Sequence, residues 1–573
     1  MARGRTKGKV QEVASVSDVV KLLLENRGLT GNEDKAAFFN PPNPQKFLES
    51  PELVGIDPQD LKQAVGLVHQ AIAAGRPIII YGDYDVDGIC ATAILWEAIY
   101  RGLNYENCRP FIPDRFKHGY GLTEASVDAI VHDSKFNISD SASPLLLTVD
   151  CGITAHEAVR YAQGRGFEVL ITDHHQKEAE QSLSSAELWT DKICGAGIAW
   201  VLAQQLHPLP SLDLVALATI ADIQSLLGPN RAFVKHGLEE LNRTSRGGLR
   251  ELAHLAGLAG KSLGTYEVGW VLAPRLNAPG RLGSALDSLR LLLTNNQAQA
   301  RELAETLERI NRERREKTEA MVEHALEGVA AQVSGEAKVI IAHHASYHEG
   351  VIGLLAGRLV KEFHRPAIAI AEGKELSKGS ARSISGLNII KVLREIGDLL
   401  ESVGGHPMAA GFTIRTENIA AFEERVAVAA EPKIGEGGFR PHLTVDCEIP
   451  LALVSWDMWE ELQRFEPFGA ANPRPVFVSR GVGVVDISTV GSASQHLKLR
   501  VRSVGDDGPE GLDLTAVGFG LGNRADDLQL GDVLGVVYSL GENCWNGRRS
   551  LELYSKDFRP LGESRSLSGL APG

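Results

Sequence analysis

The stretch YGDYDVDG, residues 81–88, carries carboxylates at every second position: Asp83, Asp85 and Asp87. This spacing matches the first half of a calcium-binding EF-hand loop, whose bidentate Glu would fall at position 94, where this chain has Ile94. An EF-hand also needs a helix before the loop, whereas the preceding PIIIY is typical of a strand. The three carboxylates therefore indicate a metal chemistry other than calcium binding.

Carboxylates with this spacing suit a pair of metal ions. In an extended segment, side chains two positions apart lie on the same side of the chain, roughly 6 to 7 Å apart. Such a set can bracket two ions about 3.5 to 4 Å apart, and two ions at that distance activate water and stabilise the attacking and leaving oxygens of a phosphoryl group. We therefore expect the chain to hydrolyse a phosphoester.

Polar residues also end later apolar runs that are interpreted as strands. LLLTVD ends on Asp150, VLITDHH ends on Asp173, His174 and His175, and LVALATIAD ends on Asp222. Any one of these acids could simply cap a following helix. Four such sites in order favour convergence, because the carboxyl ends of parallel strands form the ligand crevice of an open sheet. A donor set of Asp and His without Cys suits Mn²⁺ or Mg²⁺ better than structural zinc.

A phosphate-binding P-loop is the competing interpretation. LAGLAGKS, residues 255–262, ends in Gly-Lys-Ser, but the motif requires Gly at its first position, where this chain has Leu255. No strand precedes the segment, so a P-loop ATPase is excluded.

The elements that must position these residues follow from hydrophobic patterning. Between residues 61 and 180, short apolar runs alternate with amphipathic segments, which predicts βαβ units and a parallel sheet. Residues 295–332 lack Pro and predict a long charged helix that joins this lobe to a second α/β lobe starting at KVIIAHH (338–344). After a Gly/Pro-rich linker at 430–442, short strands with an Asn-Gly turn predict a small β-barrel.

The expected fold class is therefore α/β, with two α/β lobes joined by a long helix and followed by a barrel of the OB type. The predicted parts are an N-terminal segment (1–60), a catalytic domain (61–240), a helical connector (241–332), a substrate-binding domain (333–430), a nucleic-acid-binding barrel (440–560) and a tail (561–573).

Composition narrows the class of protein. The 573 residues are 43% hydrophobic, as in a globular multidomain chain, and the net charge of -14 argues against a protein that coats nucleic acid over its whole surface. The six cysteines show no regular spacing, which favours free thiols and a cytoplasmic location. The basic N-terminus lacks the apolar core of a signal peptide, and no stretch of 18 apolar residues occurs, so we expect no membrane role.

Several motifs, in order, resemble those of the DHH phosphoesterase superfamily: GDYDVDG, TVDCGIT and TDHH. Within the superfamily, the chain is most similar to bacterial exonucleases that degrade single-stranded DNA from 5′ to 3′, and the similarity covers roughly residues 50–560. The supporting segments are IPDRFKHGYGL (112–122), ADIQSL (221–226), APRLNAPGRLGSA (273–285), HEGVIGLLAGRL (348–359), GSARSI (379–384), GGHPMAAGF (404–412) and PFGAANPRPVF (467–477).

The resemblance implies two Mn²⁺ or Mg²⁺ ions. One ion would be held by Asp83, Asp85 and Asp150, and the other by Asp87, Asp150, His174 and Asp222. Relatives in the superfamily have a His near the position of Asp83, which leaves open whether Asp83 is a ligand or supports its neighbours. His175 would donate to the scissile phosphate or the leaving group, and Asp173 would orient the loop.

The resemblance also implies substrate contacts in all three domains. Arg115, Asn277 and Arg281 would line the nucleotide path, and His348 is a further candidate in the second lobe. Small residues there would let backbone N–H groups approach the terminal 5′ phosphate and sugar, beside Ser380, Arg382, Gly404, Gly405 and His406. The barrel would bind single strands through Lys498, Arg500, Arg502, Trp545, Arg548 and Arg549.

The expected function is metal-dependent 5′ to 3′ degradation of single-stranded DNA to 5′ mononucleotides in DNA repair and recombination. The strand would enter through a narrow cleft between the lobes. Expected partners are a single-strand-binding protein and a RecQ-type helicase, and we expect a monomer. An oligoribonuclease or cyclic-dinucleotide phosphodiesterase of the superfamily is the first alternative, although these usually lack a C-terminal barrel. A catalytically inert DNA-binding scaffold would have lost metal ligands, all of which are present.

Overall fold

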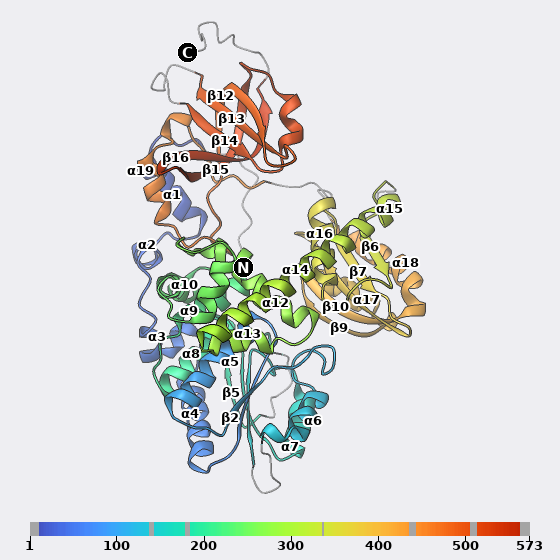
Figure 1. Cartoon of the computed structure of the whole chain (residues 1–573). Coiled ribbons are helices and arrows are strands. Elements are labelled where there is room, and N and C mark those ends of the chain that lie inside the picture. The colour runs from blue at the N-terminus through green and yellow to red at the C-terminus, as the bar shows by residue number, and fades with distance from the viewer. Residues whose placement is uncertain are drawn as a thin grey trace. The chain divides into compact units, whose positions relative to one another are not determined.

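The computed structural model describes residues 11–136, 143–177, 184–334, 337–434, 443–504 and 513–561 (Figure 1). The basic segment 1–10, residues 435–442 of the predicted linker and residues 562–573 of the predicted tail lie outside these ranges. The chain divides into two compact units. Unit 1 comprises Met1–Lys46, Ile223–Lys235 and Leu443–Gly573, and unit 2 comprises Phe47–Asp222 and His236–His442.

The first lobe of unit 2 is built on a parallel five-stranded sheet in the order β2-β1-β3-β4-β5. Its strands are β1 (Ile78–Gly82), β2 (Cys108–Phe111), β3 (Leu145–Val149), β4 (Glu168–Asp173) and β5 (Ala186–Trp189). All five residues of both β1 and β3 are buried, because helices cover both faces and the strands can be continuously apolar. The parallel sheet predicted from the sequence is confirmed.

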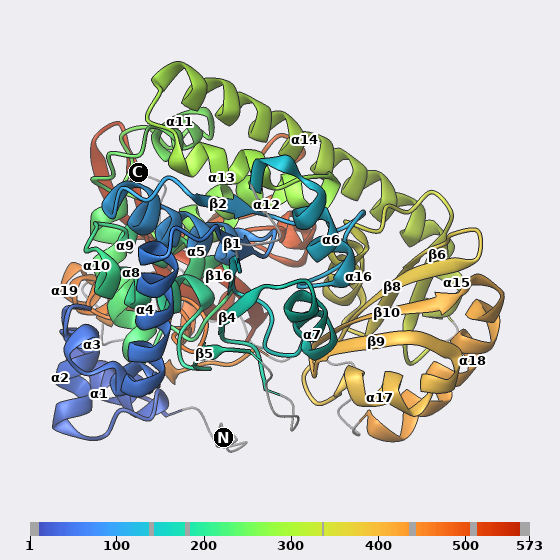
Figure 2. The same cartoon turned by 90° about the horizontal axis from the view of Figure 1, so that it is seen from below.

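Helices cover the two faces of this sheet (Figure 2). One face packs against α5 (Val86–Trp96) and α8 (Gly195–Leu206), and the other against α6 (Glu124–His132) and α7 (His156–Gly164). The remaining helices of this lobe are α3 (Lys46–Glu49), η1 (Pro51–Val54), α4 (Pro58–Ala73), η2 (Glu97–Gly102), η3 (Ser134–Phe136) and α9 (Leu212–Ala221). Helix α10 (Gly228–Leu241) begins in unit 1 and ends in unit 2.

The interpretation of LVALATIAD as a strand was wrong. These residues lie in α9, and Asp222 is the C-cap of that helix. An apolar run of this length does not distinguish a buried strand from a buried helix, and its Ala and Leu content favours the helix. Nearly every residue of α9 is buried, which explains why no amphipathic period marks it in the sequence.

The predicted joining helix is confirmed as α14 (Gln297–Gly328). Asn296 caps its start by accepting a hydrogen bond from the N–H of Gln299. The first half of α14 packs on the connector helices, and its last turns enter the core of the second lobe through Met321 and Ala325. The connector comprises α11 (Gly247–Leu255), the π-helix η4 (Glu267–Leu272), α12 (Ala273–Leu282) and α13 (Leu286–Leu293), and α15 (Ala330–Ser334) follows α14.

The second lobe has a mixed sheet in the order β6-β7-β8-β10-β9, in which only the β6–β7 pair is parallel. The strands are β6 (Ile340–His344), β7 (Ala367–Ala371), β8 (Leu376–Arg382), β9 (Leu400–His406) and β10 (Ala409–Arg415). Two separate cores flank the sheet: one includes α16 (Ile352–Phe363), and the other includes α17 (Ile389–Glu395) and α18 (Ile419–Ala430). Two strongly apolar layers therefore hold this lobe together.

Unit 1 contains the predicted β-barrel, whose strands run in the order β11-β12-β13-β14-β16-β15 and close through a β12–β15 pairing. The strands are β11 (Cys447–Glu448), β12 (Phe477–Val490), β13 (His496–Ser503), β14 (Leu514–Gly518), β15 (Val533–Trp545) and β16 (Arg548–Pro560). Asn546 and Gly547 have φ of 50° and 76°, as a two-residue hairpin turn requires. The barrel core also includes residues of α1 (Val16–Asn26), α2 (Asn32–Phe39) and α19 (Trp456–Gln463).

None of the helices in the described ranges is both long and apolar enough to cross a bilayer. All six cysteines are free thiols, and all but Cys544 are buried.

Candidate metal centre

The three carboxylates of the opening stretch lie where β1 meets α5. Asp85 is the N-cap of α5, and its Oδ1 accepts hydrogen bonds from the N–H of Asp87 at 2.9 Å and of Gly88 at 3.2 Å. A Cβ at position 88 would lie 2.5 Å from the backbone N and O of Asp83, so only glycine fits. The cap and this close approach hold the loop tightly against the sheet edge.

Asp87 is held by the start of a second helix. Its two carboxylate oxygens accept hydrogen bonds from the N–H groups of Gly195 and Ala196, each at 2.7 Å. These N–H groups belong to the first turn of α8, whose positive end favours a carboxylate. These two hydrogen bonds fix the side chain of Asp87.

Asp150 follows β3 with a left-handed backbone, at φ of 61°. Gly195 makes room for it, because a Cβ at position 195 would lie 2.7 Å from the Cβ of Asp150. The Oδ1 of Asp150 is buried and accepts no hydrogen bond from a described residue, although Nε2 of His174 lies 3.0 Å away. A buried carboxylate oxygen without a donor is costly unless a cation occupies the site.

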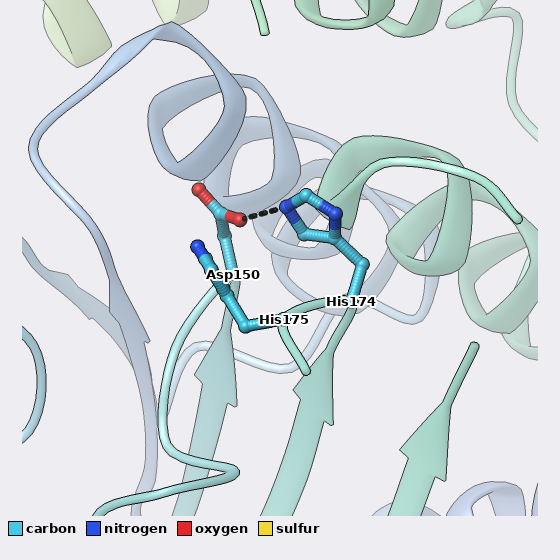
Figure 3. A group of neighbouring side chains, drawn as sticks. All are labelled: Asp150, His174 and His175. Atoms are coloured by element: carbon cyan, nitrogen blue, oxygen red, sulfur yellow. Dashed lines mark ion pairs between the residues drawn. The ribbon is translucent and has the colours of Figure 1, made fainter. Parts of the chain in front are cut away.

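Asp173, His174 and His175, at the end of β4, make different contacts. Asp173 is buried and accepts hydrogen bonds from the N–H groups of Ile153, His174 and His175 and from Nδ1 of the His175 ring, which lies 2.7 Å away. Figure 3 shows that the His174 side chain points toward Asp150. Asp173 therefore holds the backbone of both histidines and the ring of His175.

The acidic and histidine side chains converge. Three sets of ligand atoms each lie within 4.8 Å of one another: Asp83, Asp85 and Asp150; Asp87, His174 and Asp222; and Asp150, His174 and His175. Nε2 of His174 lies 3.5 Å from Oδ2 of Asp87 and 3.7 Å from Oδ2 of Asp222. The first two sets match the division expected between two ions, with Asp150 lying between them.

The electrostatics of the centre also suit divalent cations. Burial, followed by the charge of Asp85, raises the pKa of Asp83 to about 8. Burial and neighbouring carboxylates also raise the pKa of Asp85 and raise that of Asp150 well above its usual range. Without a cation these carboxylates repel one another, so an oxygen-rich set with one or two imidazoles fits Mn²⁺ or Mg²⁺.

The Asp173–His175 pair behaves in the opposite way. The hydrogen bond that the His175 ring donates to Asp173 raises the pKa of His175 to about 9, despite partial burial. Burial disfavours ionisation of Asp173, but its hydrogen bonds from His175 and Ile153 outweigh that effect and lower its pKa. His175 is thus held protonated at neutral pH beside the carboxylates.

The residues expected along the nucleotide path lie beside this centre. The Oδ1 of Asn277 accepts a hydrogen bond from the N–H of Val86 at 3.0 Å, so Asn277 supports the metal loop. The guanidinium of Arg115 stacks over the ring of Tyr84, 5.1 Å from its centroid. Neither Arg115 nor Arg281 forms an ion pair with a described residue, and burial lowers the pKa of Arg281. Both guanidinium groups are therefore available to an anion.

His348 belongs to the second lobe but meets the first. Its ring contacts Phe116 edge to face, with centroids 5.6 Å apart, and its Nδ1 accepts a hydrogen bond from the N–H of Gly350 at 3.1 Å. A Cβ at position 350 would lie 1.8 Å from the carbonyl oxygen of Arg281. The two lobes therefore approach closely at the end of α12.

The candidates of the second lobe share one face of its sheet. Arg382 and His406 both pair with Ala409, while Ser380 and Gly404 both pair with Gly411. Residues in register and two positions apart along a strand lie on the same face, so these four candidates are neighbours. Gly405 alternates to the other face, where its φ of 136° and its contact with Ala410 require glycine.

The start of α16 lies against this face. A Cβ at Gly353 would lie 2.8 Å from Nη2 of Arg382 and 3.2 Å from Oγ of Ser380. A helix N-terminus beside a guanidinium and a hydroxyl suits an anionic group.

The barrel candidates are only partly available. Arg500 and Arg502 form ion pairs with Asp513, and Arg549 pairs with Glu542. Lys498 and Arg548 form no ion pair with a described residue and are exposed, as is Trp545 at 73%. The positive charge that the barrel offers is therefore smaller than the sequence suggested.

Two contributors to the centre were not identified from the sequence. Gly195 and Ala196 act through backbone N–H groups, which carry no side-chain signal. A Gly-x-Gly segment at a helix start could have indicated an anion-holding turn, although such glycines are common for other reasons.

Comparison with known proteins gives three family models in the same order along the chain. They are the "DHH family, N-terminal domain" at residues 77–220, the "DHHA1 domain" at 336–430 and the "RecJ OB domain" at 445–557. Together they cover each of the lobes and the barrel.

Individual relatives extend the match over nearly the whole chain. "Single-stranded-DNA-specific exonuclease RecJ" of Bacillus subtilis is 33% identical over 95% of this chain and 68% of its own length. The protein of the same description from Thermus thermophilus is 35% identical over 92% of this chain and 75% of its own length. The crystal structure of Thermus thermophilus RecJ in complex with Mn²⁺ matches with a TM-score of 0.77 and 30% identity, covering 99% of this chain and 82% of that one. A second structure of that RecJ contains Mg²⁺ and matches with a TM-score of 0.73. From these matches, together with the three domains, it follows that the chain belongs to the RecJ family of DHH proteins.

Proposed function

We propose that the chain is a divalent-metal-dependent exonuclease that degrades single-stranded DNA from the 5′ end and releases 5′ mononucleotides. The observation that carries the proposal is the convergence of two carboxylate-rich ligand sets around Asp150 at the carboxyl edge of the parallel sheet. The description of the RecJ relatives as single-stranded-DNA-specific exonucleases, and the Mn²⁺ and Mg²⁺ in the Thermus thermophilus structures, support it.

Two ions would be held by the ligand sets described above. Asp83, Asp85 and Asp150 would hold one, and the other would be held by Asp87, Asp150, His174 and Asp222. When bound, such a pair activates water and stabilises charge on a phosphoryl group. The Oδ1 of Asp150, which is buried and accepts no hydrogen bond from a described residue, would be one of the ligand atoms.

The residues of the chain supply orientation and a proton donor. Asp173 accepts the Nδ1–H of His175 and holds the ring protonated, so Nε2–H can donate to a phosphate oxygen or to the leaving oxygen. Asn277 and the cap formed by Asp85 keep the metal loop in place. The chain thus fixes its ligands before a substrate arrives.

The second lobe would define the polarity of cleavage. Ser380, Arg382 and the start of α16 form an anion-binding surface beside the same lobe's Gly404 and His406. A terminal phosphate held there would align the first internucleotide linkage with the metal centre. Cleavage would then release one nucleotide at a time from the 5′ end.

The remaining expectations belong to the same proposal. The barrel would hold the single strand through Trp545, Lys498 and Arg548, and the enzyme would act as a monomer in the cytoplasm in DNA repair and recombination. A single-strand-binding protein and a RecQ-type helicase would supply its substrate, which suits a chain of net charge -14 that does not bind DNA strongly through bulk electrostatics.

The test compares single-stranded and duplex DNA of one sequence, labelled at either end, in the presence of Mn²⁺ or Mg²⁺. The wild type should release labelled mononucleotide from the 5′ end of the single strand, and Asp150→Ala should not. Equal degradation from the 3′ end, or activity that survives the substitution, would refute the proposal. Cyclic dinucleotides and short RNA serve as competitor substrates, and a preference for either would favour the small-substrate branch of the superfamily.

A further inference from the structure

The exposed aromatic side chains of unit 2 lie on two segments of the chain. Among the Phe, Tyr and Trp residues described in unit 2, only Phe116, Tyr120, Tyr266 and Trp270 are exposed. Tyr266 is 65% and Trp270 75% exposed. Phe116 and Tyr120 lie in the loop after β2. Tyr266 and Trp270 lie at the start of the helix that continues into α12. Each segment also carries a residue that contacts the loop of the metal centre: Tyr120 contacts Tyr84, and Asn277 accepts the hydrogen bond from Val86.

The helix that carries Tyr266 and Trp270 runs along the centre and touches it at several points. Gly269 fits against α9, because a Cβ there would lie 3.4 Å from Ile220, two residues before Asp222. Further along, Asn277 accepts the hydrogen bond from Val86. Trp270 thus follows Gly269, which packs on α9, and α9 ends at Asp222, a proposed metal ligand.

The two rings share one side of the helix. Residues four apart are neighbours on a helix surface, and both side chains are exposed while the intervening Val268 is buried. Tyr266 directly precedes the π-helical segment η4 (Glu267–Leu272), and Trp270 lies within it. Short π-helical segments occur often at functional sites. Because Pro274 has no N–H, the carbonyl of Trp270 cannot accept the usual hydrogen bond of an α-helix from it, which accounts for the departure from regular α-helix.

The contact of the second lobe with one end of this helix favours one direction for a bound strand. At the far end of the helix, Gly350 of the second lobe packs directly on the carbonyl of Arg281. A strand whose 5′ end is held by the second lobe would therefore continue away from it, past Asn277 toward Trp270. At 1.5 Å per residue, the seven residues from Asn277 to Trp270 span roughly 10 Å, a distance of a few nucleotides.

We propose that Tyr266 and Trp270 form a base-stacking platform for single-stranded DNA on the 3′ side of the cleavage site. This inference rests on the proposed exonuclease function and adds a surface that the metal centre, the second lobe and the barrel do not include. Large exposed rings stack on any base, so the platform would bind without sequence preference. The residues just before them, Lys261 and Ser262, are polar and exposed.

The experiment uses the full-length chain with Tyr266→Ala, Trp270→Ala and the double variant. Tyr266→Phe and Trp270→Phe keep a ring and serve as matched controls, and Val428→Ala removes an apolar side chain of similar exposure elsewhere in unit 2. The substrates are a long single-stranded oligonucleotide and a 5′-phosphorylated dinucleotide, which is too short to reach the platform. KM and kcat are measured for both over a series of salt concentrations.

The expected result is a KM for the long strand that rises about tenfold for each ring removed. The dinucleotide constants and the slope of log KM against log salt should not change, because no phosphate contact is lost. The Phe variants and Val428→Ala should match the wild type. An unchanged KM for the long strand in the double variant would overturn the inference, as would an equal loss on the dinucleotide. Failure of the wild type to hydrolyse either substrate would instead refute the proposed function.

Discussion

Nε2 of His174 lies 3.0 Å from Oδ1 of Asp150, at the ends of two adjacent parallel strands. The same nitrogen is within 3.7 Å of carboxylate oxygens from Asp87 and Asp222, which come from two different helices. One imidazole thus joins the four structural elements that form the centre. Each of those elements is fixed by contacts that do not involve a metal, so the site is organised before an ion binds.

Metal binding should stabilise the protein more at pH 8 than at pH 5. The pKa of Asp83 is about 8 in the folded metal-free protein and roughly 3.9 when unfolded. Because the folded state binds the extra proton, its stability is fully present below the unfolded pKa and falls as pH rises toward 8. Metal ions replace that proton, so the rise in Tm on adding Mn²⁺ should grow over this interval.

Differential scanning calorimetry with Mn²⁺ or with a chelator checks this prediction. Asp83→Asn removes the titrating group, so the metal-free stability of that variant should depend less on pH. A Tm difference that is constant from pH 5 to pH 8 would contradict the expected proton linkage.

Asp173→Asn should reduce kcat by roughly 10- to 100-fold, the usual cost of losing an outer partner of a metal-site histidine. Without the carboxylate, the pKa of His175 should fall from about 9 toward its ordinary value. The wild-type pair contributes stability that is fully present below the unfolded His pKa and is lost as pH rises through about 9. NMR titration of the metal-free protein measures the pKa of His175 directly.

The control is Asp128→Asn, which removes a carboxylate that pairs with Arg165 on the surface of the same lobe. That variant should keep the activity of the wild type. If His175 titrates at the same pH in Asp173→Asn and in the wild type, the assigned hydrogen bond does not control its protonation.

Gly195→Ala should abolish most activity while leaving the fold intact. The added methyl group would lie 2.7 Å from Cβ of Asp150 and 3.0 Å from its Oδ1, and the N–H of residue 195 also holds Asp87. Gly357→Ala is the matched control, because it is a helical glycine whose Cβ would meet nothing within 4 Å. That substitution should raise stability by roughly 0.5 to 1 kcal/mol. Equal activity of the two variants, measured on single-stranded DNA, would show that the close approach to Asp150 is not needed.

The sequence predicted the parts of the centre that depend on strand ends. Asp150 and His174 follow continuous apolar runs, and the carboxyl ends of parallel strands meet at one edge, so their proximity follows from a general rule. Asp222 was also expected near the centre, but for the wrong reason, because α9 was interpreted as a strand. The N–H donors of Gly195 and Ala196 could not be predicted, since backbone groups carry no mark in the residue types.

Sequence patterns could not predict that three separate segments of the chain form unit 1. The hydrogen bond from Arg231 to Phe38 joins residues 193 positions apart, and its bonds to the segment around Phe465 span more than 230 positions. Periodicity describes only local structure, so it does not indicate which distant segments pack together. The two α/β lobes and the barrel were predictable because each is built mainly from consecutive segments.

Arg231→Met should destabilise unit 1 by roughly 3 kcal/mol or more, since several buried carbonyl groups would lose their donor at once. Arg231 is 1% exposed, and its guanidinium donates to the backbone carbonyls of Phe38, Phe465 and Glu466, among others. It has no carboxylate partner among the residues that the structure describes. Chemical denaturation should show an earlier transition for this variant. Affinity for a long strand should fall, whereas hydrolysis of a dinucleotide should persist. Arg480→Met, at an exposed arginine of the same unit, is the control and should leave the transition unchanged.

Arg382→Ala should separate recognition of the 5′ end from the chemistry. Arg382 lies beside Ser380 and the start of α16 and forms no ion pair with a described residue, so a phosphate would supply the charge partner of its guanidinium. Loss of a charge-assisted hydrogen bond to a dianionic terminal phosphate should raise KM by roughly 10- to 150-fold for a 5′-phosphorylated strand. The same strand with a 5′-hydroxyl makes no such contact and should show little change. Arg415→Ala, which removes an exposed arginine at the other end of the same sheet, should affect neither substrate. An equal rise in KM for the two strands would mean that Arg382 contacts an internal phosphate, and the polarity of cleavage would then have to arise elsewhere in the second lobe.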